Sequence, residues 1–194
     1  MTPTASMPVA LNGKPPAAPD VYAGKIALRA VHPDDLHLLW IWLNEFPRAN
    51  FDDYSPKTFE EFQVEIFQRM QPDSSGRVRE FIVVALLDGK PIGFIGYRPI
   101  TERLGTLHGI CFSKAVHGKG HAAFAVRNLI NAIMKDGKVQ KIEANYFKDN
   151  ARIKKFLRKL GFEHEGTRFD HTLRQGKPID VSLVALYRRN WKET

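Results

Sequence analysis

Two glycines, Gly118 and Gly120, stand one residue apart between a short apolar run and a long amphipathic pattern. The apolar run covers Leu107–Phe112 and the amphipathic pattern extends to Met134, so the order is strand, glycine turn, helix. Glycines at this spacing allow backbone N–H groups to point into one small space at the positive end of a helix dipole. Such a concavity suits a phosphate or pyrophosphate group. A plain tight turn before a helix is the alternative.

A second segment, Asn150–Phe162, favours the phosphate interpretation. It reads NARIKKFLRKLGF, with an Asn opening a helical pattern that closes in Leu-Gly-Phe. Together the two segments resemble the GNAT superfamily of acyl-CoA-dependent N-acyltransferases, and the resemblance covers roughly Lys25 to Trp191. The family turn runs Arg/Gln-x-x-Gly-x-Gly/Ala, and this chain departs from it by having His117 at the first position. The closest likeness is to the branch that acetylates protein N-termini, including those of ribosomal proteins, and various small amines.

The resemblance implies that acetyl-CoA is the acyl donor substrate and that no metal is required. In the family, the strand before the glycine turn offers backbone N–H groups to the pantetheine arm and the acyl oxygen. The Asn that opens the later helix contacts the cofactor arm or an ordered water. The expected cofactor-binding residues are therefore Ile110, Cys111, Phe112, Ser113, His117, Gly118, Lys119, Gly120, His121, Ala122 and Asn150.

Amine attack on a thioester requires a deprotonated amine, a stabilised oxyanion and a proton for the leaving thiolate. His108 is the leading candidate for the base and Asn150 the second expected catalytic residue. In a regular strand, residues 106, 108, 110 and 112 share one face, and family members with a Glu base carry it on this strand. Imidazole also suits proton transfer near neutral pH. A purely structural His108 is the alternative, and the fallback bases are Glu45, Glu80 and Glu143.

Two further positions bear on the chemistry. Many family members place a Tyr seven residues after the Asn as a general acid, and Leu157 occupies that position here. The acid is then water, another side chain or absent, because a thiolate of moderate basicity needs little help. Cys111 could accept an acyl group, but the sequence offers it no clear His or Asp relay. We expect it to be a small buried residue instead.

Composition indicates one core. The 194 residues are 43% hydrophobic, so we expect a flexible N-terminal tail over residues 1–24 and a single domain over residues 25–194. The tail lacks the basic and apolar regions of a secretory signal. Cys111 is the only cysteine, which excludes an intrachain disulfide and favours a reducing compartment, so a cytoplasmic protein is expected. No apolar run approaches the roughly 20 residues that a membrane span needs.

Positive charge is concentrated in one part of the chain. Residues 114–160 carry 12 Lys and Arg against 3 Asp and Glu, although the whole chain has a net charge of only +8. Coenzyme A carries a pyrophosphate and a 3′-phosphate, so cations beside the glycine turn fit the resemblance. A nucleic-acid-binding surface would look similar, and a solvated helix face without a partner is the third interpretation.

The order of elements expected from periodicity is β-α-α-β-β-β-α-β-α-β-β. Thr58 with Glu61 forms a capping-box pattern before the second helix, and Asp88–Lys90 and Gln175–Lys177 are hairpin signals. This pattern predicts an α/β (α+β) protein. The resemblance makes it the GNAT fold, a mixed central sheet of about seven strands flanked by about four helices. The strands are expected at residues 25–31, 79–87, 91–98, 105–112, 139–145, 162–174 and 178–187.

The sequence therefore predicts an N-acetyltransferase that moves an acetyl group from acetyl-CoA to a primary amine by direct attack in a ternary complex. The acceptor is a small molecule or a protein N-terminus, and the enzyme is a monomer or a homodimer with no membrane partner. Two alternatives stay open. A catalytically silent acyl-CoA-binding module is favoured by Leu157 and His117, and an acetyltransferase acting on a nucleic-acid-associated amine is favoured by the basic segment.

Overall fold

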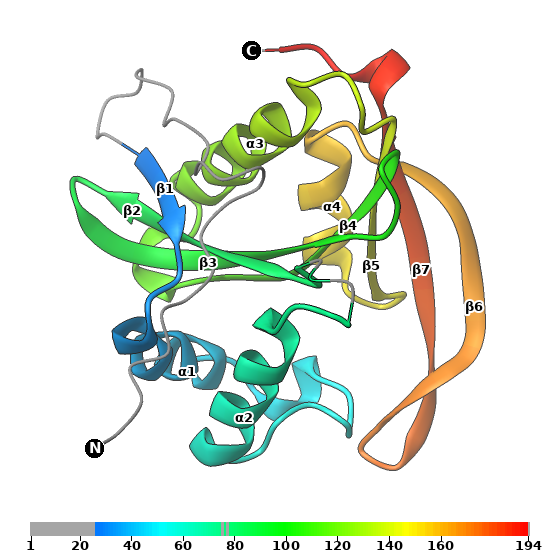
Figure 1. Ribbon diagram of the computed structural model, residues 1–194. Helices are drawn as coiled ribbons and strands as arrows, with labels where there is room; N and C mark the ends of the chain where they lie inside the picture. The colour runs from blue at the N-terminus through cyan, green and yellow to red at the C-terminus, as the bar shows by residue number, and fades with distance from the viewer. Residues whose placement is uncertain (1–25, 75, 77, 194) are drawn as a thin grey trace.

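A seven-stranded mixed sheet forms the centre of the computed structural model, which describes residues 26–74, 76 and 78–193 (Figure 1). The strand order is β1-β2-β3-β4-β5-β7-β6, and every neighbouring pair is antiparallel except β4 and β5. The predicted fold class is confirmed. The strands are β1 (Ile26–Ala30), β2 (Phe81–Leu87), β3 (Lys90–Pro99), β4 (Leu104–Phe112), β5 (Lys141–Phe147), β6 (Glu163–Arg174) and β7 (Lys177–Tyr187).

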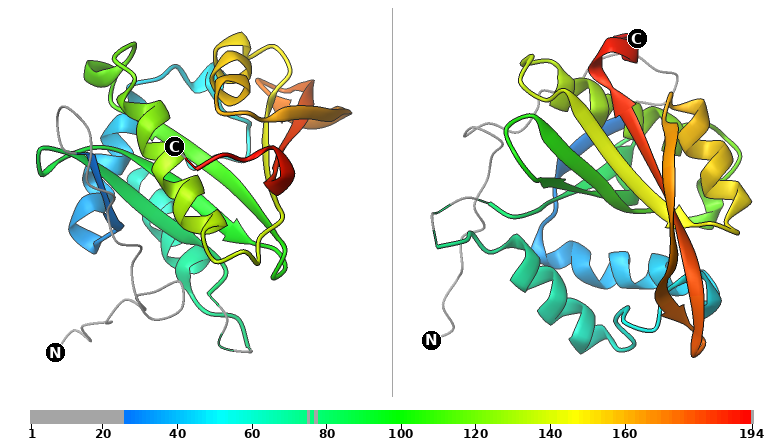
Figure 2. Two further views of the ribbon diagram at one scale, coloured as in Figure 1. Left: turned by 90° about the horizontal axis from the view of Figure 1, so that it is seen from above. Right: turned by 90° about the vertical axis from the view of Figure 1, so that its right-hand side faces the viewer.

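Two pairs of helices cover opposite faces of the sheet (Figures 1 and 2). The pair α1 (Leu36–Asn44) and α2 (Phe59–Met70) packs on one face around buried Leu39, Trp42 and Phe62. The pair α3 (His121–Met134) and α4 (Ala151–Lys159) lies on the other face, over a larger core. Short 3-10 turns occupy Pro33–Asp35, Arg48–Asn50, Lys114–Val116 and Arg188–Asn190.

Local signals in the sequence set several of these boundaries. The Thr58 hydroxyl accepts a hydrogen bond from Glu61 N, and the Glu61 carboxylate accepts one from Thr58 N, so the predicted capping box begins α2. Asp88 and Gly89 both have positive φ, which a tight hairpin turn between β2 and β3 requires. Gly161, at φ +91°, ends α4 in the left-handed conformation, as predicted.

The β6–β7 hairpin extends past the rest of the sheet, alongside the layer of α1 and α2 (Figure 1). It turns at Gln175 and Gly176, which have φ of +54° and +71°, and so confirms the predicted hairpin. The predicted tail, residues 1–24, lies outside the described residues. Within the described part of the chain, no helix has the length and apolar character needed to cross a membrane.

Candidate active site

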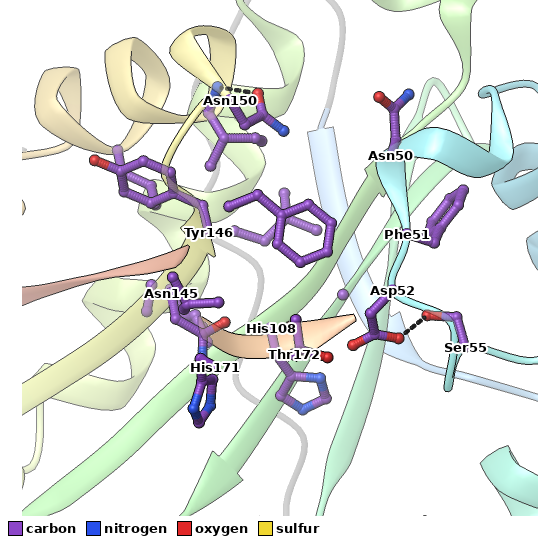
Figure 3. A pocket seen from close by; sticks show the side chains of 18 of the residues that line it. Asn50, Phe51, Asp52, Ser55, His108, Asn145, Tyr146, Asn150, His171 and Thr172 are labelled. Carbon is purple, nitrogen blue, oxygen red and sulfur yellow. Dashed lines mark hydrogen bonds between the residues drawn. The ribbon is translucent and has the colours of Figure 1, made fainter. Parts of the chain in front are cut away.

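A cavity of about 570 Å³ lies where β4 and β5 part. Parallel pairing joins only Leu104–Leu107 to Lys141–Ala144 and stops before the end of either strand. The volume is within the range of small-molecule sites, and the lining comes from both faces of the sheet (Figure 3). The lining residues are Asn50, Phe51, Asp52, Tyr54, Ser55, Leu107, His108, Gly109, Ile110, Ala144, Asn145, Tyr146, Phe147, Asn150, Ile153, Leu157, His171, Thr172 and Val181.

A β-bulge at Gly109 changes the alternation of side chains along β4. His108 pairs with Gly96 and Cys111 pairs with Phe94, so two residues of β4 oppose one residue of β3. Gly109 adopts φ +56°, a backbone conformation that suits glycine. The expectation that residues 106, 108, 110 and 112 share a face is therefore wrong. His108 stays on the α1–α2 side and is joined there by Cys111, whereas Ile110 and Phe112 pack on the α3 side.

The bulged end of β4 also decides which backbone N–H groups are available. Ser113 N donates to Ile92 O at 3.0 Å, so this amide is already paired within the sheet. The prediction that the Ser113 amide contacts the cofactor is therefore corrected. Because N–H groups of alternate residues in a strand point the same way, Cys111 turns its amide toward β3 as well. The amides of Ile110 and Phe112 then point to the side of β4 where pairing with β5 has ended.

The glycine turn leaves the start of α3 open. Gly118 and Gly120 have φ of +77° and +85°, which residues with side chains rarely adopt. Gly120 is the N-cap and offers no side chain to cap the helix, whose first bond runs from Phe124 N to Gly120 O at 3.1 Å. The N–H groups of the three residues after Gly120 have no acceptor within the helix. This arrangement can receive an anion through backbone donors and the helix dipole.

Cations and an aromatic pair surround this turn. His117 Nε2 lies 2.9 Å from Phe112 O, and its ring stacks on Phe46 with the centroids 5.6 Å apart. Lys114 Nζ and Arg152 Cζ lie 5.7 and 6.0 Å from the centroid of the same Phe46 ring. His117 therefore braces the turn against the segment that follows α1, and Arg152 brings positive charge from the first turn of α4.

The start of α4 faces the cavity. Asn150 Oδ1 accepts a hydrogen bond from Ile153 N at 3.1 Å, which caps the helix and leaves the amide NH₂ group as the donor end of this side chain. Leu157, seven residues after Asn150, also lines the cavity and is 2% exposed. A hydrocarbon side chain thus stands where many family members have Tyr, as the sequence indicates.

His108 lines the other side of the cavity and contacts a buried carboxylate. Its Nε2 lies 3.1 Å from Glu80 Oε1, and Arg98 Nη2 donates to Glu80 Oε2 at 3.0 Å. The His108–Glu80 contact is short but poorly aligned, and neither atom has another hydrogen-bonding partner among the described residues. Burial alone would raise the pKa of Glu80, but the contacts with His108 and Arg98 outweigh burial and lower it. Glu80 is thus held as a carboxylate.

The other candidates for base or nucleophile lie elsewhere. Glu45 accepts from Lys114 N at 2.6 Å, and Glu143 pairs with Lys141 Nζ at 2.7 Å; neither lines the cavity. Cys111 is buried beside Phe94, and burial, assisted by the negative charge of Glu45, raises the pKa of its thiol to about 12. The thiol is therefore protonated near neutral pH and is a poor nucleophile. Among the described residues, no three His, Cys, Asp or Glu side chains gather so that they could hold a metal ion.

The α1–α2 side of the cavity is closed by a loop fastened to the β6–β7 hairpin. Gln175 N and Gly176 N each donate to the Asp53 carboxylate at 2.8 Å, and Asp53 N donates to Leu173 O at 2.8 Å. The neighbouring Asp52 accepts a hydrogen bond from Ser55 Oγ at 2.8 Å (Figure 3). This side of the cavity was not predicted from the sequence, because the loop and the hairpin that form it lie more than 100 residues apart in the chain.

The model of the acetyltransferase (GNAT) domain family matches residues 25–163, which is most of the chain. The chain belongs to the GNAT acetyltransferase family. The predicted enzyme class, an acetyl-CoA-dependent N-acetyltransferase, is thereby confirmed.

Two curated relatives of the chain are named as N-acetyltransferases. The chain is 24% identical over 173 residues to the uncharacterized N-acetyltransferase p20 of Bacillus licheniformis, covering 88% of this chain and 97% of that protein. It is 32% identical over 107 residues to the L-amino acid N-acetyltransferase AaaT of Escherichia coli, covering 53% of this chain and 65% of that protein.

Two solved structures show that the fold is shared. The spermidine N-acetyltransferase of Vibrio cholerae, solved with CoA and spermine, has a TM-score of 0.70 and 18% identity, over 85% of this chain and 96% of that one. The ribosomal-protein-S5-alanine acetyltransferase of Vibrio fischeri has a TM-score of 0.69 and 22% identity, over 86% and 95%. Ribosomal-protein acetyltransferases thus stand among the proteins that share the predicted fold.

The cavity brings together part of the predicted site. His108, Ile110 and Asn150 line it, and Phe112 turns its amide to the same side of β4. The glycine turn lies beyond the end of β4, at the start of α3, and not in the cavity lining. Residues that line the cavity and were not predicted include Asp52, Asn145, Tyr146, His171 and Thr172.

Proposed function

We propose that this GNAT protein transfers the acetyl group of acetyl-CoA to a primary amine, with both substrates bound at once and no acyl-enzyme stage. The observation that carries the proposal is a single cavity lined from both faces of the sheet. One side holds the start of α4 and the opened edge of β4, and the other holds an imidazole. A donor and an acceptor can thus approach one point from opposite sides.

The donor side has the groups that a coenzyme A thioester requires. The open amides after Gly120 suit the pyrophosphate, and Lys114, Lys119 and Arg152 place positive charge near or on the turn. Asn150 and the amides of Ile110 and Phe112 would contact the pantetheine arm and the acyl oxygen. Acetyl-CoA supplies an acetyl group already activated as a thioester.

The acceptor side supplies the base. A primary amine is protonated to an ammonium ion at neutral pH, and His108 would take one of its protons, directly or through water. The freed nitrogen lone pair forms the C–N bond as the C–S bond breaks, and the second amine proton leaves the nitrogen afterwards. Because Leu157 has no proton to give, the departing thiolate would take its proton from water or from another side chain of the cavity.

Direct attack is favoured over an acyl-enzyme route by Cys111. The thiol is buried, is held protonated and is not part of the cavity lining. With this thiol excluded as the nucleophile, direct attack of the amine on the thioester is the route that we propose. Holding the two reactants in one cavity supplies the rate advantage of proximity.

The experiment is release of free thiol from acetyl-CoA in the presence of a panel of primary amines, which includes polyamines, amino acids and N-terminal peptides. Release that depends on an amine, with matching acetylated product by mass spectrometry, supports the proposal. Tight acetyl-CoA binding without release for any amine would instead indicate the silent binding module. Binding to RNA or duplex DNA that falls steeply with added salt would favour a nucleic-acid-associated acceptor.

A further inference from the structure

A carboxylate stands behind His108, out of reach of the cavity. Glu80 precedes β2 and is 2% exposed, and it does not line the cavity. An isolated buried charge is costly, and it persists only where cations and hydrogen bonds compensate it. Here Arg98 binds Oε2 at 3.0 Å, and Arg69 Nη1 lies 3.8 Å from Oε1. The third neighbour of this carboxylate is His108, at 3.1 Å from Oε1.

The backbone beneath His108 is shaped to admit its ring. Gly96 pairs with His108 across β3 and β4. A Cβ added at Gly96 would stand 2.4 Å from His108 Cε1 and 2.8 Å from each ring nitrogen. Any side chain at this position would therefore displace the imidazole from its contact with Glu80. Gly96 does not have a positive φ, so its backbone conformation does not require glycine. Its structural role is to leave room for the His108 ring.

The ring nitrogens then have different tasks. An ionised carboxylate only accepts hydrogen bonds, so the nitrogen facing it must carry the proton. His108 Nε2 is buried and faces Glu80, whereas the side chain as a whole is 21% exposed and lines the cavity. With the proton on Nε2, the lone pair of the neutral ring resides on Nδ1.

We infer that Glu80 is a positioning residue that fixes the Nε2–H tautomer of His108 and leaves Nδ1 free to take a proton from the acceptor amine. The effect of Glu80 on turnover rests on the proposed function, whereas its effect on the tautomer does not. Arg98 and Arg69 stabilise the Glu80 carboxylate. The absence of a side chain at Gly96 leaves room for the imidazole beside it. Once an amine proton reaches Nδ1, Glu80 stabilises the resulting imidazolium, as a carboxylate does behind other catalytic histidines.

Glu80→Gln is the informative substitution because it keeps size and shape while removing charge. Arg98 offers only donors, so the amide oxygen of the new side chain turns toward it and the NH₂ group turns toward His108. His108 Nε2 must then accept, which moves the ring proton to Nδ1. We expect turnover with an accepted amine to fall about 10²–10⁴-fold, while acetyl-CoA affinity measured by calorimetry stays unchanged.

The tautomer is measured independently of turnover. Nitrogen-15 NMR of histidine-labelled protein at about pH 9, above the ordinary histidine titration, separates the Nε2–H and Nδ1–H forms. The chain has seven histidines, and the His108→Asn spectrum identifies the signal of interest. We expect Nε2–H for the wild-type protein and Nδ1–H for Glu80→Gln. An unchanged tautomer, or full turnover in Glu80→Gln, overturns the inference.

Two further variants separate positioning from stability. Gly96→Ala leaves Glu80 intact but pushes the ring away, so it should lose turnover in the same way and tests the inference even if Glu80→Gln does not fold. Asp35→Asn is the matched control, because Asp35 is another buried carboxylate, bound to Arg29 at 2.6 and 2.7 Å and absent from the cavity. It should lower stability without altering turnover. If the wild-type protein acetylates no amine, the proposed function fails while the NMR result still decides the role of Glu80.

Discussion

The bulge at Gly109 can be tested through its strain. Gly109 adopts φ +56°, and an added Cβ would meet only Phe94 Cε2 at 3.7 Å, which is ordinary contact. Gly109→Ala therefore introduces no clash, and its cost is the left-handed backbone alone, about 1–2 kcal/mol. For a chain of this length each kcal/mol lowers the melting temperature by about 2–4 °C, so a decrease of about 2–8 °C is expected. Gly109→Asn should lower the melting temperature less than Gly109→Ala, because Asn tolerates this backbone conformation better.

The assay is thermal and urea unfolding of wild type, Gly109→Ala and Gly109→Asn, with Gly137→Ala as control. Gly137 has φ +81° and nothing within 4 Å of an added Cβ, and it lies outside the cavity lining. Both alanine variants should lose similar stability, but only the change at Gly109 should also weaken acetyl-CoA binding, because the bulge directs the amides of Ile110 and Phe112. Wild-type stability in Gly109→Ala would refute the strained bulge.

Four shorter predictions concern other parts of the molecule. Gly120→Val should weaken coenzyme A binding at least tenfold, about 1.4 kcal/mol, in calorimetry; unchanged affinity in a folded variant would exclude the phosphate site. Asp53→Ala should raise the KM for the amine and spare acetyl-CoA affinity, since it releases the loop from the hairpin; an unaltered KM would show that the fastening is dispensable. Cys111→Ser should retain turnover, and the wild-type thiol should resist maleimide at neutral pH; rapid labelling of folded protein would contradict its burial. Asp35→Asn should destabilise at pH 7, and the deficit should shrink as pH falls below about 4. Burial alone would raise the pKa of Asp35, but its hydrogen bonds with Arg29 and the His32 amide outweigh burial and lower the folded-state pKa. The stabilisation that the Asp35 carboxylate provides is therefore lost when it is protonated. A stability deficit that persists at low pH would argue against this role of Asp35.

Features that depend on neighbouring residues were predictable from the sequence. The capping box of Thr58 and Glu61 and the cap of α4 by Asn150 are set by side chains three residues from their partners. The two hairpin turns follow from glycines that must adopt positive φ. The glycine turn before α3 has the same origin. Each of these predictions needed only a short window of sequence.

Features that depend on strand register were not predictable. A Gly inside an apolar run is compatible with a regular strand or with a bulge, and only the pairing of β4 with β3 decides for the bulge at Gly109. The contact of Glu80 with His108 spans three strands, so from the sequence Glu80 was predicted only as one of three fallback bases and not as a partner of His108. Asp53 and the tip of the β6–β7 hairpin meet across most of the chain.

Under the proposed function, the bulge also explains how one short strand could face both substrates. Without the extra residue, side chains would alternate regularly, and Ile110 and Phe112 would follow His108 onto the α1–α2 face. The bulge reverses the alternation after His108, so His108 stays on the α1–α2 side while Ile110 and Phe112 pack toward α3. The same reversal sets the N–H groups of Ile110 and Phe112 at the edge where β5 has departed. A single glycine conformation therefore couples the direction of His108, the proposed base, to the placement of the amides proposed to bind the donor. This is why strain at Gly109 should affect acetyl-CoA binding as well as stability.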